Sequence, residues 1–220
     1  MTALASVTPS TVAPRQRMPN PVRSARTREK LMRATIECLY ELGYDRTSTV
    51  LVTKRAGVSR GAMLHQFPSK ADLMMAASEY IRVQRREAHV GALKGIDDPV
   101  AKLRKLVDIT WSELSKPSGV ARIEIMLASR SDKAFGARFS ELNADLDARH
   151  KAWMWEIAQA AGIKDKAAIE AMATLYTAAL RGLAIDLLQP GFRARVEAAV
   201  DLLRDYQNQR LEALIRAARG

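Results

Sequence analysis

The chain has 220 residues, of which 48% are hydrophobic, and it contains no apolar run of the ~18–20 residues that a membrane span requires. A single cysteine excludes an intramolecular disulfide framework, and the N-terminal residues lack the apolar segment of a secretory signal, so we expect a cytoplasmic protein. The net charge is +11 and is uneven, with 15 basic against 7 acidic residues in 1–90 and 20 against 17 in 91–220. The N-terminal part is therefore the part expected to face a polyanion.

The N-terminal region begins with a segment that the composition marks as a tail. Residues 1–24 are rich in Ser, Thr and Pro, contain arginines and no acid, and are expected to form a disordered basic tail. Apolar residues at helical spacing then predict a helix from Arg26 to Leu42, which Gly43 ends. Thr47 or Ser48 can cap the helix that follows.

The second helix is predicted to end at Ala56, with Gly57 in the turn, and a very short third helix lies between Ser59 and Pro68. A helix of about one and a half turns does not stabilise itself in water, so neighbours must hold it. Met63 and Phe67 are four residues apart and are expected to pack on the first two helices. Two short helices joined by a glycine turn are typical of a helix-turn-helix unit, which we expect over residues 25–70.

The remaining side chains of this unit are candidates for contact with double-stranded DNA, because Arg, His and Gln can read base edges in the major groove. The residues that we expect to face bases are Arg60, Ala62, His65 and Gln66. Those that we expect to lie along the DNA backbone are Thr47, Thr49, Ser59, Leu64 and Lys70. Gly61 would let the two backbones approach each other closely.

Residues 71–220 are expected to form a larger helical domain. Six helices are predicted there or at its border, over residues 70–93, 98–115, 120–130, 132–161, 165–188 and 192–218, with no convincing strand. The predicted fold is therefore all-α, with about nine helices in total.

Apolar stripes on these helices predict an effector pocket and a dimer interface. The candidate pocket residues are Leu106, Thr110, Trp111, Met126, Phe139, Leu146, His150 and Trp153, among which Thr110 and His150 are polar groups on apolar faces. The candidate interface residues are Ala171, Leu175, Ala178, Gly182, Val200 and Leu203. In both cases the alternative is that the stripe belongs to the core of one chain.

The run "AGVSRG", followed by Phe67, "PSK" and Leu73, resembles the TetR family of one-component helix-turn-helix regulators, and "AALRGLAIDLL" resembles that family's penultimate helix. Leu64 and Gln66 stand where the family usually has Tyr and His. The resemblance implies a homodimer that binds a palindromic operator, acts as a repressor by default, and is released when an unidentified small-molecule effector changes the spacing of the two DNA-binding units.

Other functions have less support in the sequence. We find no nucleophile elbow, no phosphate loop and no paired metal ligands, so we expect no enzyme, cofactor or metal site. The alternative to an effector-controlled regulator is an effector-independent or architectural DNA-binding protein with a solid C-terminal core. A basic helical protein that lies on a membrane is disfavoured, because acids and bases alternate along the stripes.

Overall fold

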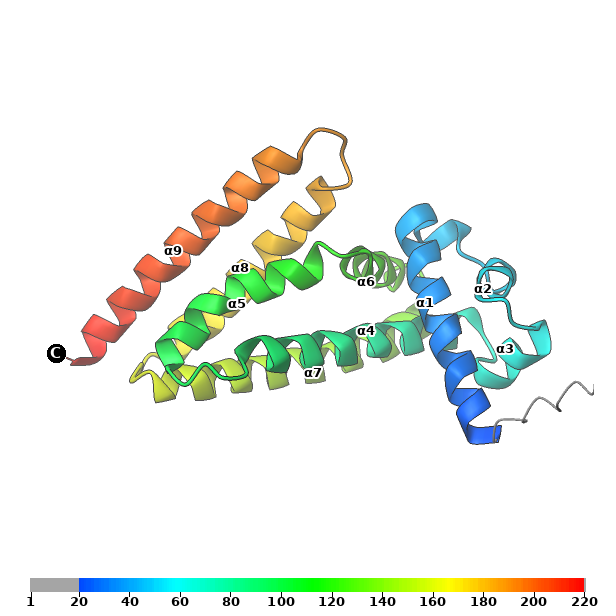
Figure 1. The fold of residues 1–220 in the computed structure, drawn as a ribbon, viewed down its shortest axis with the longest axis horizontal. Coiled ribbons are helices and arrows are strands. Elements are labelled where there is room, and N and C mark those ends of the chain that lie inside the picture. The colour runs from blue at the N-terminus through cyan, green and yellow to red at the C-terminus, as the bar shows by residue number, and fades with distance from the viewer. Residues whose placement is uncertain (1–19, 220) are drawn as a thin grey trace, which may run out of the picture.

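The computed structural model describes residues 20–219, and this part of the chain folds into nine α-helices without a strand, which confirms the predicted fold class. The first three helices gather at one end of the molecule, and α4 and α7 run from there toward the end that carries the C-terminus (Figure 1). The helices are α1 Asn20–Arg46, α2 Thr49–Ala56, α3 Arg60–Gln66, α4 Lys70–Leu93, α5 Pro99–Leu114, α6 Pro117–Ala128, α7 Lys133–Ala160, α8 Lys166–Asp186 and α9 Arg193–Arg219.

The first helix departs from the sequence prediction at its start. It begins at Asn20 rather than near Arg26, so residues 20–24 are helical and do not belong to a tail, while residues 1–19 of the predicted tail lie outside the described part. Pro21 provides the physical reason, because proline fits the first turn of a helix. Gly43 interrupts the helix with φ of 75°, a left-handed conformation that glycine adopts without strain.

The N-terminal helices share one hydrophobic core with α6 and α7. The side chains of Leu31, Met63 and Phe67 are buried in it, and Phe135 and Phe139 of α7 join them. Phe139 is only 2% exposed and its ring centroid lies 5.9 Å from that of Phe135. The prediction of Phe139 as a pocket residue is therefore wrong, since this side chain holds α7 against the helix-turn-helix unit.

A second core joins α5, α8 and α9 within the larger helical region. Val107, Leu180 and Val200 are buried in it, and Trp111 and Leu203 pack against its edge. Val200 is 2% exposed in the single chain, so it has no surface left for a second copy. The stripe on α9 that contains Val200 and Leu203 thus belongs to the core of one chain, which was the alternative interpretation of that stripe.

Among the helices of residues 20–219, α8 is the one long and apolar enough to cross a membrane, with a mean hydropathy of 1.2 over its best window. This helix contacts α5, α6, α7 and α9, and Glu170 and Arg181 lie within it. Only 28% of that window is buried in the single chain, so one face of α8 remains exposed.

Candidate functional sites

The geometry of the short α3 follows from its two caps and its two buried side chains. Gly57 takes the left-handed turn after α2, and the Ser59 hydroxyl accepts a hydrogen bond from the Ala62 backbone N–H at 3.2 Å. Met63 and Phe67 are 1% and 3% exposed, which anchors the inner face of the helix. Neighbouring helices therefore hold α3 in place, and its outer face is left for a ligand.

The outer face of α3 carries several of the predicted DNA-binding residues. Arg60, Gly61 and His65 are exposed, and the Leu64 side chain is 45% exposed. Exposed Ser59 stands at the start of the same helix. The helix thus presents one guanidinium, one imidazole and one apolar side chain at the tip of the molecule. Thr49 and Ala62 are half-buried at its margin.

Three other predicted DNA contacts are engaged inside the protein. Thr47 is fully buried and its hydroxyl donates to the Gly43 carbonyl oxygen at 2.7 Å, so the prediction that it lines the DNA backbone is wrong. The Lys70 ammonium donates to the Tyr44 carbonyl oxygen at 2.8 Å and lies 4.0 Å from the centroid of the Tyr44 ring. Burial also lowers the pKa of Lys70. Its charge ties α4 to the end of α1, so it is not available to a phosphate in this conformation.

Gln66 is the third of these residues. Its side chain is half-buried, and its amide nitrogen donates to the Ser24 hydroxyl at 2.6 Å. This hydrogen bond joins the end of α3 to the first turns of α1. In this arrangement Gln66 positions two helices of the unit and does not face a base.

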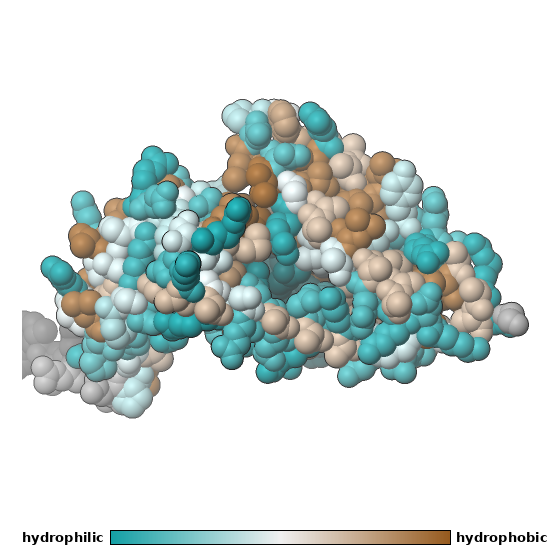
Figure 2. All heavy atoms as spheres, turned by 180° about the vertical axis from the view of Figure 1, so that it is seen from behind, coloured by the Kyte–Doolittle hydropathy of each residue, from teal (hydrophilic) through white to brown (hydrophobic). Residues whose placement is uncertain are grey.

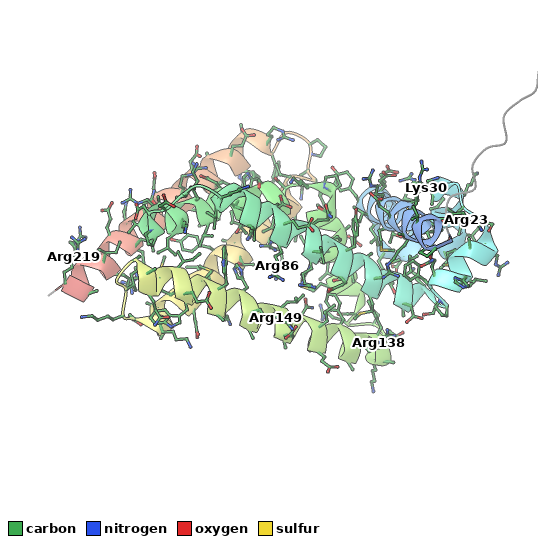
Figure 3. The ribbon with its side chains drawn as sticks, turned by 60° about the horizontal axis from the view of Figure 1, so that its bottom comes forward. Arg23, Lys30, Arg86, Arg138, Arg149 and Arg219 are labelled. Atoms are coloured by element: carbon green, nitrogen blue, oxygen red, sulfur yellow. The ribbon has the colours of Figure 1, made fainter. Side chains whose placement is uncertain are left out.

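A row of basic residues on α1 was missed by the sequence prediction. Arg23, Arg26 and Lys30 are exposed and follow one another at helical spacing, so they lie on one face of α1. Figure 3 labels Arg23 and Lys30 at the end of the molecule that also carries α3. The signal was present in the sequence, but Arg23 had been assigned to the tail.

A cavity of about 750 Å³ lies between α4, α6, α7 and α8. Figure 2 shows the molecule hollowed near its middle, with hydrophilic side chains lining the hollow. Four predicted pocket residues line this cavity: Met126, Leu146, His150 and Trp153. The sequence prediction missed the arginines beside them, which come from all four helices: Arg82, Arg85, Arg86, Arg122, Arg149 and Arg181.

The other predicted pocket residues lie elsewhere. Leu106 and Thr110 border a separate small cavity of about 30 Å³, which His150 also touches. That volume is close to the size of one water molecule, so it offers no room for an effector. Trp111 packs at the edge of the core formed by α5, α8 and α9.

His89 and His150 form a compact group with Trp153 at the wall of the larger cavity. The ring centroids of the two histidines are 6.3 Å apart, and each lies 6.0 Å from the ring of Trp153. Burial lowers the pKa of His89 to about 3 and that of His150 to about 4, and the charge of Arg85 acts in the same direction on both. Both imidazoles are therefore neutral near pH 7. In residues 21–219, no three His, Cys, Asp or Glu side chains come together as metal ligands.

The buried histidines predict a loss of stability in mild acid. The unfolded chain binds protons at histidine below a pKa of about 6.5, whereas folded His89 does not, so the free energy of unfolding falls as the pH drops from 7 toward 5. From the depressed pKa of about 3, the contribution of His89 at pH 5 is a loss of about 2 kcal/mol relative to pH 8. The His89→Gln variant is expected to lose that part of the pH dependence in urea unfolding at the two pH values. Exposed His65→Gln is the control, and an unchanged pH dependence in His89→Gln would contradict the assignment.

One helix, α6, borders both the cavity and the helix-turn-helix unit. Arg122 and Met126 line the cavity, while the carboxylate of Glu124 accepts a hydrogen bond from the Tyr44 backbone N–H at 2.9 Å. The same carboxylate lies 3.3 Å from the position that a Cβ on Gly43 would take. The helix α6 is therefore in direct contact with both the cavity and the end of α1.

The N-terminal unit matches known proteins in sequence. Residues 31–77 match the family model described as bacterial regulatory proteins of the tetR family. An uncharacterized HTH-type transcriptional regulator of Mycobacterium tuberculosis is 33% identical over 115 residues, which make up 50% of this chain and 57% of that protein. The HTH-type transcriptional regulator BetI of Yersinia pestis is 36% identical over 84 residues, or 37% of this chain and 42% of BetI. The chain thus spans about half the length of the curated relatives that it matches.

Solved structures resemble the whole fold. A TetR transcription regulator from Haloarcula marismortui aligns with a TM-score of 0.67 and 20% identity over 86% of this chain and 98% of its own. A transcriptional regulator from Saccharomonospora viridis, solved in complex with choline, aligns with a TM-score of 0.63 and 19% identity over 86% and 96% of the two chains. The sequence match to bacterial regulatory proteins of the tetR family thus lies in the N-terminal unit, and the fold as a whole is similar to that of solved TetR regulators.

Proposed function

We propose that the chain is a dimeric repressor, in which two copies bind a palindromic operator through α3 and leave it when a small molecule fills the cavity. The observation that carries this proposal is the position of α6. Its residues Arg122 and Met126 line the cavity, and its Glu124 is bonded to Tyr44 of the helix-turn-helix unit. A ligand that binds more tightly to one position of α6 would therefore favour one orientation of α3. If that orientation differs from the one that binds DNA, the ligand releases the operator.

Contact with DNA is supported by the exposed outer face of α3. Arg60 and His65 offer donors to base edges, and Leu64 offers an apolar contact for a thymine methyl group. The basic row Arg23, Arg26 and Lys30 on α1 provides charges for phosphates. Since phosphate contacts carry no sequence information directly, we assign the direct reading of base edges to Arg60 and His65.

Dimerisation is supported by an exposed face of α8. Ala171, Leu175, Ala178 and Gly182 are all exposed there, and Leu175 is 63% exposed. On α9, Leu202 is 50% exposed and Tyr206 is 53% exposed. We therefore propose that these two side chains, and not Val200 and Leu203, contact the second copy. Small residues let helices of two copies approach closely, and two helices from each copy form a four-helix bundle.

The alternative function is an effector-independent DNA-binding protein, which would need a solid helical core. A cavity of about 750 Å³ lies within the range of small-molecule sites and favours the effector-controlled protein. One structural neighbour, from Saccharomonospora viridis, was solved in complex with choline, which supports a small-molecule ligand for this fold. A DNA-binding regulator of this kind acts in the cytoplasm and without catalysis.

The dimer is tested by a charge on the exposed face of α8. Leu175→Asp should give a monomer in analytical ultracentrifugation without unfolding, because the side chain is 63% exposed in the single chain. Operator affinity should then fall by about a hundredfold or more, because a monomer contacts one half-site. The matched control is Val83→Asp on α4, where the side chain is 38% exposed and lies outside the proposed interface. A dimer of undiminished stability in Leu175→Asp would contradict this interface.

A further inference from the structure

The cavity between α4, α6, α7 and α8 is unusually basic for a space inside a helical domain. Six arginines line it, and the lining contains one acidic residue, Asp147. In Figure 3, Arg86 on α4 and Arg149 on α7 lie near the middle of the molecule, far from Arg219 at the end of α9. Arg85, Arg122 and Arg181 are half-buried, and charges withdrawn from water are normally paired, so this cluster requires an explanation.

Internal ion pairs account for only part of this charge. Within residues 21–219, Arg82 is paired with Glu79, and the Arg149 guanidinium lies 3.0 Å from a carboxylate oxygen of Asp145. Arg85, Arg86, Arg122 and Arg181 have no acidic partner within 4.0 Å in the same part of the chain. Arg122 donates instead to the neutral side-chain oxygen of Asn143 at 2.5 Å.

The unpaired arginines also repel one another. Burial lowers the pKa of Arg122 to about 10, and the charges of Arg85 and Arg181 act in the same direction. Burial lowers the pKa of Arg85 as well, and Arg181 adds to that effect. The acid that acts on Arg85 is Glu113, whose carboxylate already lies 2.5 Å from the ammonium of Lys116. The cavity therefore brings together three guanidinium groups, an arrangement that a bound anion would stabilise.

The wall of the cavity also has an apolar part. Ile81 is buried, and Met126, Leu146 and Trp153 are half-buried where they line the space. A ligand without an apolar body would leave these side chains in contact with water, whereas an apolar body gains from their burial. The basic part and the apolar part of the cavity wall together suit an amphipathic ligand, with an anionic head and an apolar body.

We propose that the cavity binds an amphipathic organic anion, whose carboxylate or phosphate head is held by Arg85, Arg122 and Arg181 and whose apolar body packs against Trp153. This assignment rests on the proposed function, because it takes the cavity to be the effector site. Guanidinium groups suit either head, since each can form two parallel hydrogen bonds with a carboxylate or a phosphate.

The first test compares two fluorescent probes with the same aromatic body, one carrying a charge and one not. Anilinonaphthalene sulfonate is an amphipathic anion, and phenylnaphthylamine is its uncharged counterpart. Titration of the full chain in the absence of DNA should give saturable binding of the anion about tenfold tighter than that of the neutral probe. Equal affinities, or no saturable binding of the anion, would overturn the proposal.

Matched variants locate the charge that the probe requires. Arg85→Met should weaken binding of the sulfonate by about tenfold and leave binding of the neutral probe unchanged, whereas Arg85→Lys keeps the charge and should retain much of the affinity. Arg219→Met at the far end of α9 is the control for net charge. A purely structural role for Arg85 would instead weaken both probes alike. A second readout is the melting temperature of the free protein, which should rise in Arg85→Met because a repelled, half-buried charge is replaced by an apolar side chain of similar length.

Displacement of the sulfonate probe distinguishes the possible heads. Stronger displacement by octyl phosphate assigns a phosphate head, and stronger displacement by octanoate assigns a carboxylate head. Displacement by octanol or octyltrimethylammonium as strong as by these anions would overturn the proposal. Because these titrations contain no DNA, their failure is distinct from a failure of the proposed function, which would appear as an inability of the bound anion to release operator DNA.

Discussion

Arg60→Ala is expected to weaken binding to the specific operator by about 1–3 kcal/mol, or roughly tenfold or more, while binding to random DNA changes little. Arg60 is exposed at the first position of α3, where its guanidinium can approach the two acceptors of a guanine. A contact to a base edge contributes only where the correct base is present, so its removal lowers specificity. Fluorescence anisotropy at fixed salt on both DNA types measures this difference.

Arg219→Ala is the matched control for Arg60→Ala, because it removes the same charge at the opposite end of the molecule (Figure 3). It should change neither affinity. An equal loss on operator and random DNA in Arg60→Ala would mean that this side chain contacts phosphate. The reading of sequence would then have to be assigned to His65 or to other residues of α3.

Phe139→Ala is expected to lower the free energy of unfolding by about 3–5 kcal/mol, the cost of emptying a well-packed aromatic site. The Phe139 ring is 2% exposed and packs on Phe135, whose ring centroid in turn lies 6.4 Å from that of Tyr44. The substitution therefore loosens the contact between α7 and the helix-turn-helix unit. Urea unfolding of the wild type and the variant measures the effect.

The control for Phe139→Ala is Phe192→Ala, at a half-buried position just before α9, which should cost clearly less. Binding of the sulfonate probe to Phe139→Ala should match that of the wild type below the unfolding transition, because Phe139 does not line the cavity. Weak destabilisation combined with a loss of probe binding would show that Phe139 is a pocket residue, as the sequence first indicated.

Local signals made the helix-turn-helix unit predictable from the sequence. The cap at Ser59, the turn at Gly57 and the buried pair Met63 and Phe67 each depend on residues within a few positions of one another. Such interactions can be read from spacing and residue type alone. The same reasoning located the middle helices and four residues of the cavity wall.

Partners distant in the sequence explain the intramolecular contacts that the sequence did not predict. Lys70 bonds to Tyr44 across 26 positions, and Gln66 bonds to Ser24 across 42 positions, and neither spacing follows from a helical period. From the sequence alone, both residues are polar groups on a surface helix. Their engagement inside the protein depends on how α1 packs against α3 and α4.

The arginines of the cavity were missed for a related reason. Arg85, Arg122 and Arg181 come from three different helices, and each one alone looks like a solvated position between apolar stripes. Only the packing of α4, α6 and α8 around one space brings them together. A cluster of like charges on separate helices leaves no periodic trace in the sequence.

The central claim is that two copies of the chain read DNA together through α3. Selection of binding sites from random duplex DNA tests it most directly. We expect enrichment of a palindrome whose two half-sites are separated by about one helical turn or more, and we expect Arg60→Ala to reduce the sequence selectivity at both half-sites. Enrichment of a single asymmetric site, or of no sequence at all, would contradict it.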